Sequence, residues 1–205
     1  MDWLLNFEDM LMEFLSGLGI WAPIFSSILV FLEGILAFLP LFVFVTVNIL
    51  SLSNLFGTFL GTILGVVLSW IFCVLGSFTM FFGTRRLLSD KFRNKIKNSP
   101  KTTKFMHLVD GLTYSQLVLI TSIPFSPSFF INLGAGLSTI NMKKYFCALL
   151  IGKFAEMIFL GYVGVSLIEC LTQPIALVKV GIIMLVGYGV SIVVNKKFKL
   201  DERFE

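Results

Sequence analysis

The sequence predicts an all-α polytopic membrane protein, from its composition, its charge distribution and the length of its apolar segments. Hydrophobic residues make up 57% of the 205 residues, and only 14% are charged. Soluble domains carry about 25% charged residues, and a soluble fold of this size cannot bury so much apolar side chain. Glu33 is the single charged residue between Glu13 and Arg85, and none lies between Asp110 and Lys143. Both intervals exceed the roughly 20 apolar residues that cross a bilayer.

Basic residues gather in two clusters that orient the chain. Eight lie between Arg85 and Lys104, opposed by Asp90 alone, and four lie between Lys196 and Arg203. By the positive-inside rule, both clusters face the cytoplasm. We therefore predict a multi-pass protein of the cell (plasma) membrane with a cytoplasmic C-terminus. The formal net charge of +4 reflects this topology and does not imply a nucleic-acid partner.

Proline breaks two of the apolar stretches at lengths that do not match complete crossings. Residues 20–53 would span about 51 Å as a helix, and they contain Pro40. One crossing needs about 30 Å, and two need about 60 Å plus a turn. Because proline removes a backbone donor and disfavours helix before it, we predict a re-entrant hairpin that turns near Pro40. Residues 112–142, broken by Pro124 and Pro127, predict a second one.

Each predicted hairpin is followed by a full span, and charge sidedness makes the two units run in opposite directions. In such an inverted repeat, broken helices meet at the membrane midplane and form transport sites. Two short complete spans in place of a hairpin give the same sidedness, so length alone separates the two topologies. We expect a single membrane domain over residues 1–205: an amphipathic interfacial helix (1–17), re-entrant hairpin 1 (20–53), a transmembrane helix (55–82), a cytoplasmic basic loop (85–110), re-entrant hairpin 2 (112–142), transmembrane helices (145–171 and 175–195) and a cytoplasmic tail (196–205).

Three charged side chains inside the apolar segments are the candidate substrate or proton-coupling residues. A charge at the bilayer centre costs about 2.5–3.5 kcal/mol on insertion scales. Glu33, expected on one helix face with Pro40, is therefore interpreted as a proton-coupling or headgroup carboxylate, or else as a cap for backbone groups of the first hairpin. Lys153 and Glu156 are three residues apart and can touch on one helix face. Lys153 is predicted to meet a lipid phosphate or Glu33, unless it pairs locally with Glu156 or snorkels.

Polar and small residues complete the candidate site. Asn132, in the second hairpin, can satisfy backbone groups that the prolines free, or hydrogen-bond a headgroup. Gly57 and Gly61 belong to a stripe of small residues that permits close helix contact. The residues predicted to shape the hairpins and helix contacts are Pro40, Pro124, Pro127, Gly134, Gly136, Gly57 and Gly61.

No grouping of residues indicates catalysis, a cofactor or a metal. Cys73, Cys147 and Cys170 do not have metal-type spacing, and His107 is the single histidine. No pattern of Ser, His and Asp typical of nucleophilic catalysis is present. We predict a protein that is not an enzyme, that needs no cofactor or metal, and whose partners are membrane lipids.

Motifs in the two halves match a known family in their order. Residues 123–127 carry two prolines three apart, and an asparagine and a Gly-Leu pair follow within 131–137. The first half carries Glu33, then Pro40, then Leu-Phe-Gly at 55–57. Together these motifs resemble the DedA/VTT-domain (SNARE-associated Golgi protein-like) superfamily. The arginine that the family usually carries shortly before the first of these paired prolines is missing.

The resemblance implies lipid movement, because family members are similar to phospholipid scramblases in eukaryotes and to undecaprenyl-phosphate carriers or proton-dependent transporters in bacteria. We predict a DedA-like carrier, a flippase or scramblase for a lipid phosphate headgroup (undecaprenyl phosphate or phospholipid). Coupling to protons and assembly into a homo-oligomer are left open. A proton-coupled small-solute or ion transporter is the alternative. A third is a non-transporting assembly protein that uses the glycine stripe as a docking face.

Overall fold

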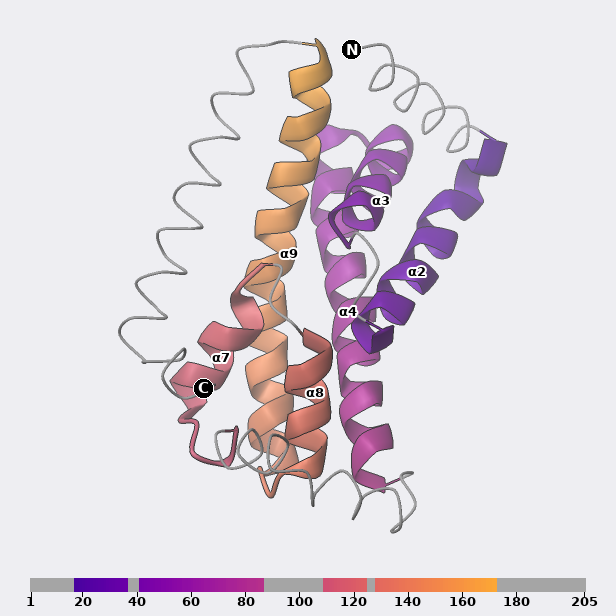
Figure 1. Cartoon of the computed structure of the whole chain (residues 1–205). Helices are drawn as coiled ribbons and strands as arrows, with labels where there is room; N and C mark the ends of the chain where they lie inside the picture. The colour runs from indigo at the N-terminus through magenta and orange to yellow at the C-terminus, as the bar shows by residue number, and fades with distance from the viewer. Residues whose placement is uncertain (1–16, 37–40, 87–108, 125–127, 173–205) are drawn as a thin grey trace.

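The described parts of the computed structural model form a helical bundle (Figure 1). They contain no strand, which confirms the all-α class. The described stretches are residues 17–36, 41–86, 109–124 and 128–172. Their helices are the 3-10 helix η1 (Gly19–Trp21) and the α-helices α2 (Ala22–Leu36), α3 (Leu41–Phe56), α4 (Thr58–Arg86), α7 (Tyr114–Ser122), α8 (Ser128–Leu137) and α9 (Met142–Thr172).

Several predicted parts lie outside the described residues. These are nearly all of the interfacial helix 1–17, most of the basic loop 85–110, the last transmembrane helix 175–195 and the tail 196–205. Pro40 and Pro127, the residues at which the two hairpins are predicted to turn, also lie outside them. These assignments stay predictions.

Three described segments are long and apolar enough to cross a membrane: Gly19–Leu36, Thr58–Arg86 and Met142–Ser166. The helices α3 and α8 are apolar but shorter. The first of the three long segments, Gly19–Leu36, lies within the predicted first hairpin and is itself long enough to cross. Length and composition do not place a helix in the bilayer, so the re-entrant paths and the inverted repeat stay predictions.

In the first half, α2 and α4 run in the same direction. Asn48 of α3 bonds Ser27 of α2 and Ser69 of α4, which places those two serines at one level. Further along both helices, Gly34 of α2 lies against Gly76 of α4. The two helices therefore lie side by side over two turns, and Gly34 and Gly76 permit a close backbone contact at one end of this stretch.

A glycine turn folds α3 back along α4. Gly57 has φ +81°, a conformation that side chains disfavour, and it separates the two helices. Gly61 and Gly65 of α4 then lie directly against the backbone of Ser53 and Ile49. The predicted small-residue stripe is thus occupied by α3 of the same chain. This occupancy argues against the docking-face hypothesis, because a partner would first have to displace α3.

We expect Gly61→Leu to destabilise the protein strongly. A side chain at this position would enter the backbone of Ser53 and Leu52. Overpacking in a tight core typically costs about 1–3 kcal/mol, and rigid backbone on the far side leaves little room to relax. The matched control is Thr79→Leu on the exposed face of the same helix. Thermal unfolding of both variants in detergent measures the difference, and equal melting temperatures would contradict the packing described above.

In the second half, α7 runs parallel to α9 and packs on it. Lys144 Nζ at the start of α9 donates to the carbonyl of Leu112, just before α7, at 2.9 Å. Near the end of α7, Thr121 lies against Gly152 of α9, and its hydroxyl bonds the carbonyl of Ala148 at 3.2 Å. A capping box between Thr113 and Gln116 begins α7. The shorter α8 runs antiparallel to α9, as its side-chain contacts below establish.

The two long helices α4 and α9 pack antiparallel at the centre. Trp70 Nε1 of α4 donates to the carbonyl of Leu150 at 2.8 Å, whereas the later Phe81 stacks on the earlier Tyr145 with ring centroids 4.7 Å apart. Figure 1 shows α2 and α3 beside one end of α4 and α7 and α8 beside the other end of the bundle. The two groups of short helices thus approach each other near the middle of α4 and α9.

Candidate functional site

A buried ion pair lies where the two halves meet. Lys153 Nζ and Glu156 Oε2 of α9 are 2.6 Å apart, and the side chains are only 2% and 3% exposed. Lys153 also donates to Ser128 Oγ, at the start of α8, at 2.9 Å. Of the alternatives open from the sequence, the structure has the local pair with Glu156. Lys153 does not snorkel, because its ammonium is held inside the protein.

Glu33 lies near this ion pair on α2, and its side chain is 8% exposed. Among the described residues no hydrogen bond or ion pair holds its carboxylate. It interacts electrostatically with both Lys153 and Glu156. Two carboxylates therefore share the field of one ammonium, so the cluster is electrically neutral only when one carboxyl is protonated. The cluster has the charge arrangement that a proton-binding site requires.

Asn132 lies one turn after Ser128 in α8 and links α8 to α9 and α2. Its Oδ1 accepts a hydrogen bond from Tyr145 Oη of α9 at 2.6 Å, and its Nδ2 faces the carbonyl of Gly34 of α2 at 3.4 Å. Since Ser128 reaches Lys153 while the later Asn132 reaches the earlier Tyr145, α8 runs antiparallel to α9. Asn132 therefore supports the backbone of α2.

Asn48 occupies the corresponding place in the first half. Its Nδ2 donates to Ser69 Oγ at 2.9 Å and lies 3.4 Å from Ser27 Oγ, and the side chain is fully buried. Its Oδ1 has no partner within the described residues. Each short helix of the pair α3 and α8 thus carries one buried asparagine that joins it to neighbouring helices.

The predicted structural residues are placed as follows. Gly136 of α8 lies against Thr84 and the carbonyl of Phe81 in α4, so it permits a close helix contact. Gly134 is buried, and its carbonyl accepts from the amide of Ser138 at 2.9 Å. Pro124 follows the end of α7. Pro40 lies outside the described residues, so the common helix face of Glu33 and Pro40 stays a prediction.

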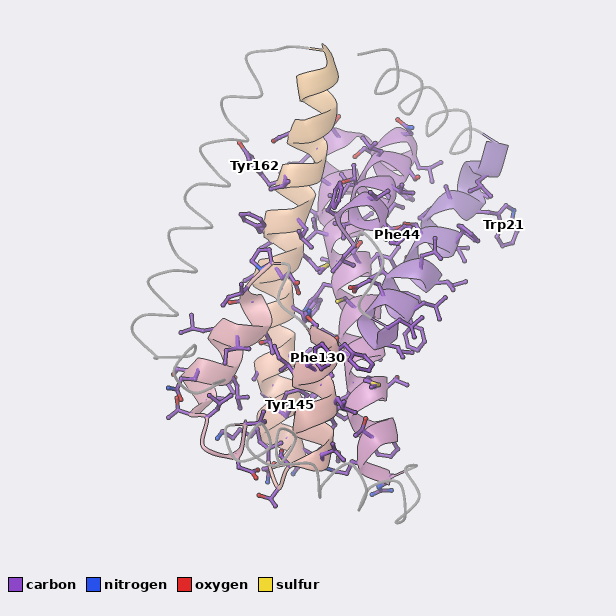
Figure 2. All side chains as sticks on the ribbon, in the orientation of Figure 1. Trp21, Phe44, Phe130, Tyr145 and Tyr162 are labelled. Atoms are coloured by element: carbon purple, nitrogen blue, oxygen red, sulfur yellow. The ribbon has the colours of Figure 1, made fainter. Side chains whose placement is uncertain are left out.

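Sequence reasoning missed Tyr145 and Arg85. Tyr145 is the largest fully buried side chain in the described part of the chain, and Figure 2 places it beside α8. Its position at the start of an apolar span gave no sign of a buried hydroxyl. Arg85 was interpreted only as the basic end of a span, but it contacts α8 through several carbonyls.

We expect Tyr145→Phe to lower stability by about 1–3 kcal/mol, because it leaves the buried Asn132 oxygen without its donor. Tyr162 on the same helix is the matched control: it is 52% exposed and points away from the bundle (Figure 2). Its replacement by Phe should change stability by less than about 0.5 kcal/mol. Unfolding free energies from titration with denaturing detergent compare the two, and equal values would disprove the role of the Tyr145 hydroxyl.

The described residues contain no group of three His, Cys, Asp or Glu side chains that could hold a metal ion. The charged groups of the cluster are one ammonium and two carboxyls, which interact through charge and hydrogen bonds. An ammonium can exchange one anionic partner for another, and a lone carboxyl can gain or lose a proton.

Comparison with known proteins decides the family. The VTT domain model matches residues 47–166, which is more than half of the chain. The chain belongs to the VTT-domain family. The resemblance to the DedA/VTT-domain superfamily that the motifs indicated is thereby confirmed, and this VTT-domain protein is a membrane protein.

Two proteins of Bacillus subtilis (strain 168) are similar to this VTT-domain protein. "Uncharacterized membrane protein YhjE" is 30% identical over 168 residues, which cover 82% of this chain and 77% of that protein. "Uncharacterized protein YqeD" is 25% identical over 148 residues, covering 72% of this chain and 67% of that protein. No solved structure matches. The VTT-domain match contains Asn132, Lys153 and Glu156, whereas Glu33 precedes it.

Proposed function

We propose that this VTT-domain protein is a carrier that moves a lipid phosphate headgroup, of a phospholipid or of undecaprenyl phosphate, across the bilayer with coupling to protons. The observation that carries the proposal is the buried cluster of Glu33, Lys153 and Glu156 at the meeting point of the short helices. A cluster of charges at this depth is costly and persists where it has a function.

Lys153 is the group that would meet the phosphate. In the present structure its ammonium donates to Glu156 Oε2 and Ser128 Oγ. A lipid phosphate entering the site would replace Glu156 as the anionic partner of Lys153. The lysine ammonium binds phosphate as a point charge, so this exchange needs no rearrangement of the ammonium. The acyl or prenyl tail would stay in the hydrocarbon beside the helices.

Glu33 is the group that would couple transport to protons. When the phosphate takes over Lys153, Glu156 loses its counter-ion and faces Glu33 across the site. Two ionised carboxyls in a dry site repel each other, and in the proposed cycle Glu33 is the one that binds a proton. Return of Lys153 to Glu156 after the phosphate leaves would release that proton. One proton would accompany each headgroup.

The helix arrangement supports an inverted repeat of re-entrant hairpins. In each half, the first helix (α2 or α7) runs parallel to the long helix that ends the half (α4 or α9). The second helix (α3 or α8) runs antiparallel to it. The long helices α4 and α9 are themselves antiparallel, so the halves are related as an inverted repeat would be. Short helices that end near a midplane site are common in transporters.

The basic ends of the long helices support the proposed orientation. Because α4 and α9 are antiparallel, Arg85 and Arg86 at the end of α4 lie at the same end of the bundle as Lys143 and Lys144 at the start of α9. The positive-inside rule then assigns this end to the cytoplasm of the cell membrane.

A second candidate is a proton-coupled small-solute or ion transporter. The observation that favours it is that Lys153 and Glu156 already satisfy each other. A site of this kind could run on the protonation of Glu33 alone, without a phosphate ligand. The two candidates differ in what accompanies the proton.

The test uses the purified full-length protein in liposomes that carry a phosphatidylglycerol with a fluorescent headgroup. A membrane-impermeant reductant removes fluorescence from the outer leaflet, so transfer exposes the inner-leaflet label as well. We expect wild-type protein to expose it and Lys153→Ala to expose far less, with Thr79→Ala, on the exposed face of α4, as matched control. A labelled short-chain polyprenyl phosphate forms the second arm.

The outcomes separate the candidates. Transfer in either arm supports the carrier and identifies the lipid class. Uptake of a solute driven by a pH gradient, with no lipid redistribution in either arm, would favour the transporter instead. If the inner-leaflet label stays as protected from the reductant as it is in empty liposomes, in both arms, the lipid proposal is overturned.

A further inference from the structure

The guanidinium of Arg85 closes the end of α8. Its Nη1 donates to the carbonyl of Ile140 at 2.8 Å, and its Nη2 donates to the carbonyls of Ala135 and Ser138 at 3.0 and 2.8 Å. Nε lies 3.4 Å from the carbonyl of Gly136. One side chain from the end of α4 thus serves four carbonyls in the last turn of α8 and just beyond it.

These carbonyls have a physical need for such a partner. The last four carbonyls of a helix have no donor within the helix, and their partial negative charge favours a cation. Because α8 has only ten residues, it is too short to be stable by itself. Its geometry therefore depends on what holds its ends.

Arginine suits this position better than lysine does. A guanidinium presents five donors in a fixed plane, whereas an ammonium has three donors around a point. The guanidinium of Arg85 also makes a cation–π contact, since its Cζ lies 4.4 Å from the centre of the Phe81 ring. Phe81 in turn stacks on Tyr145 of α9. The guanidinium is thus fixed by a stack of aromatic rings on one side and by the end of α8 on the other.

The far end of α8 carries the groups of the proposed site. Ser128, its first residue, accepts from Lys153, and Asn132, one turn later, faces the backbone of Gly34 beside Glu33. Since a ten-residue helix moves as a rigid rod, release of its C-terminal end would shift both contacts. Arg85 lies at the opposite end of α8 from the charge cluster and does not belong to it.

We propose that Arg85 is the positioning residue of the site: it fixes α8 against α4, so that Ser128 and Asn132 stay aligned with Lys153 and Glu33. The role in transport rests on the proposed function, whereas the fixing of α8 can be tested without it. The helix α8 is then a movable element whose resting position is set from its C-terminal end.

The structural test measures the distance between spin labels on α8 and α4. Phe130 and Leu75, both exposed, carry the labels after replacement by cysteine, in a background whose native cysteines are replaced by alanine. We expect a single narrow distance in the reference protein. Arg85→Lys should lose it and give a broad distribution. Arg86→Lys is the matched control, because its neighbouring guanidinium lies over Phe82 in a similar way.

Chemical rescue separates positioning from misfolding. In Arg85→Ala, millimolar methylguanidinium should restore the narrow distance, and methylammonium at the same concentration should not. An unchanged distance in Arg85→Lys would overturn the proposal. So would equal broadening in Arg86→Lys, or equal effects of the two added cations on Arg85→Ala.

The transport readout uses the pH profile. Glu33 interacts electrostatically with Lys153 and Glu156 of α9 and with Cys73 of α4. Moving α8 changes the contact of Ser128 with Lys153, and with it the electrostatic environment of Glu33. Arg85→Lys should therefore shift the pH dependence of lipid transfer as well as lower its rate. A loss of folded protein would lower the rate equally at every pH. If the wild type transfers no lipid, the proposed function fails, and the spin-label distances still decide the role of Arg85.

Discussion

Replacing Glu33 by Gln is expected to abolish the driving effect of a pH gradient on lipid transfer. The amide resembles the protonated carboxyl in shape and charge, and it cannot release a proton. If one proton moves with each headgroup, a gradient of one pH unit can drive about a tenfold accumulation, or about 1.4 kcal/mol. The variant should accumulate none, because the carrier step no longer consumes the gradient.

The measurement compares labelled-lipid distribution in proteoliposomes with and without a pH gradient. Glu33→Asp is the matched control, since it keeps an ionisable carboxyl on the same face of α2 and should retain coupling at a lower rate. Transfer in Glu33→Gln without a gradient should persist, because a neutral side chain does not block the site. A gradient-driven accumulation equal to that of wild type would show that the coupling proton binds elsewhere.

The stability of Glu33→Gln distinguishes a functional role of the Glu33 carboxyl from a structural one. Within the described residues the Glu33 carboxylate has no hydrogen-bonded partner. A buried charge without a partner costs free energy, so a neutral replacement should leave the melting temperature unchanged or raise it. A functional loss together with retained stability would separate a working carboxyl from a structural cap, which were the two interpretations open from the sequence.

Composition and spacing were enough to predict the local features. The long uncharged apolar runs predicted helices, and the three-residue spacing of Lys153 and Glu156 allowed the local ion pair that the structure contains, as one of the alternatives. Both depend on interactions between near neighbours in the sequence. The end of the first hairpin, by contrast, was placed at residue 53, whereas α3 continues to Phe56. The boundary is set by the positive φ of Gly57, which composition alone does not locate.

Contacts between distant segments could not be predicted in this way. Asn132 faces the carbonyl of Gly34, 98 residues earlier, and a backbone carbonyl leaves no mark in the sequence. For the same reason nothing distinguished Arg85 from its neighbours in the basic cluster. Its partners are four carbonyls, and their availability depends on where α8 ends. Such features follow from the packing of the halves, which an apolar pattern describes only coarsely.

Replacing Lys153 by Met is expected to be the most destabilising single change in the described part of the chain. It leaves Glu156, 3% exposed, as a buried carboxylate without its counter-ion, and it removes the hydrogen bond from Lys153 to Ser128. Removing one partner of a buried pair typically costs about 3–5 kcal/mol. Thermal unfolding and the yield of monodisperse protein in detergent measure the effect. A melting temperature within a degree or so of the wild type would mean that Glu156 is neutral before Lys153 is removed.

The double variant Lys153→Met, Glu156→Gln tests the proposed role of the pair against a purely structural one. Replacing both members of a buried ion pair by neutral groups is often neutral or stabilising, so the double variant should regain most of the stability that Lys153→Met loses. If the pair only held α9 in the bundle, function would return with stability. If Lys153 receives the phosphate, the double variant should fold and still transfer no lipid. Stability and transfer thus respond differently to the second substitution, and recovery of both would exclude Lys153 as the phosphate-binding group.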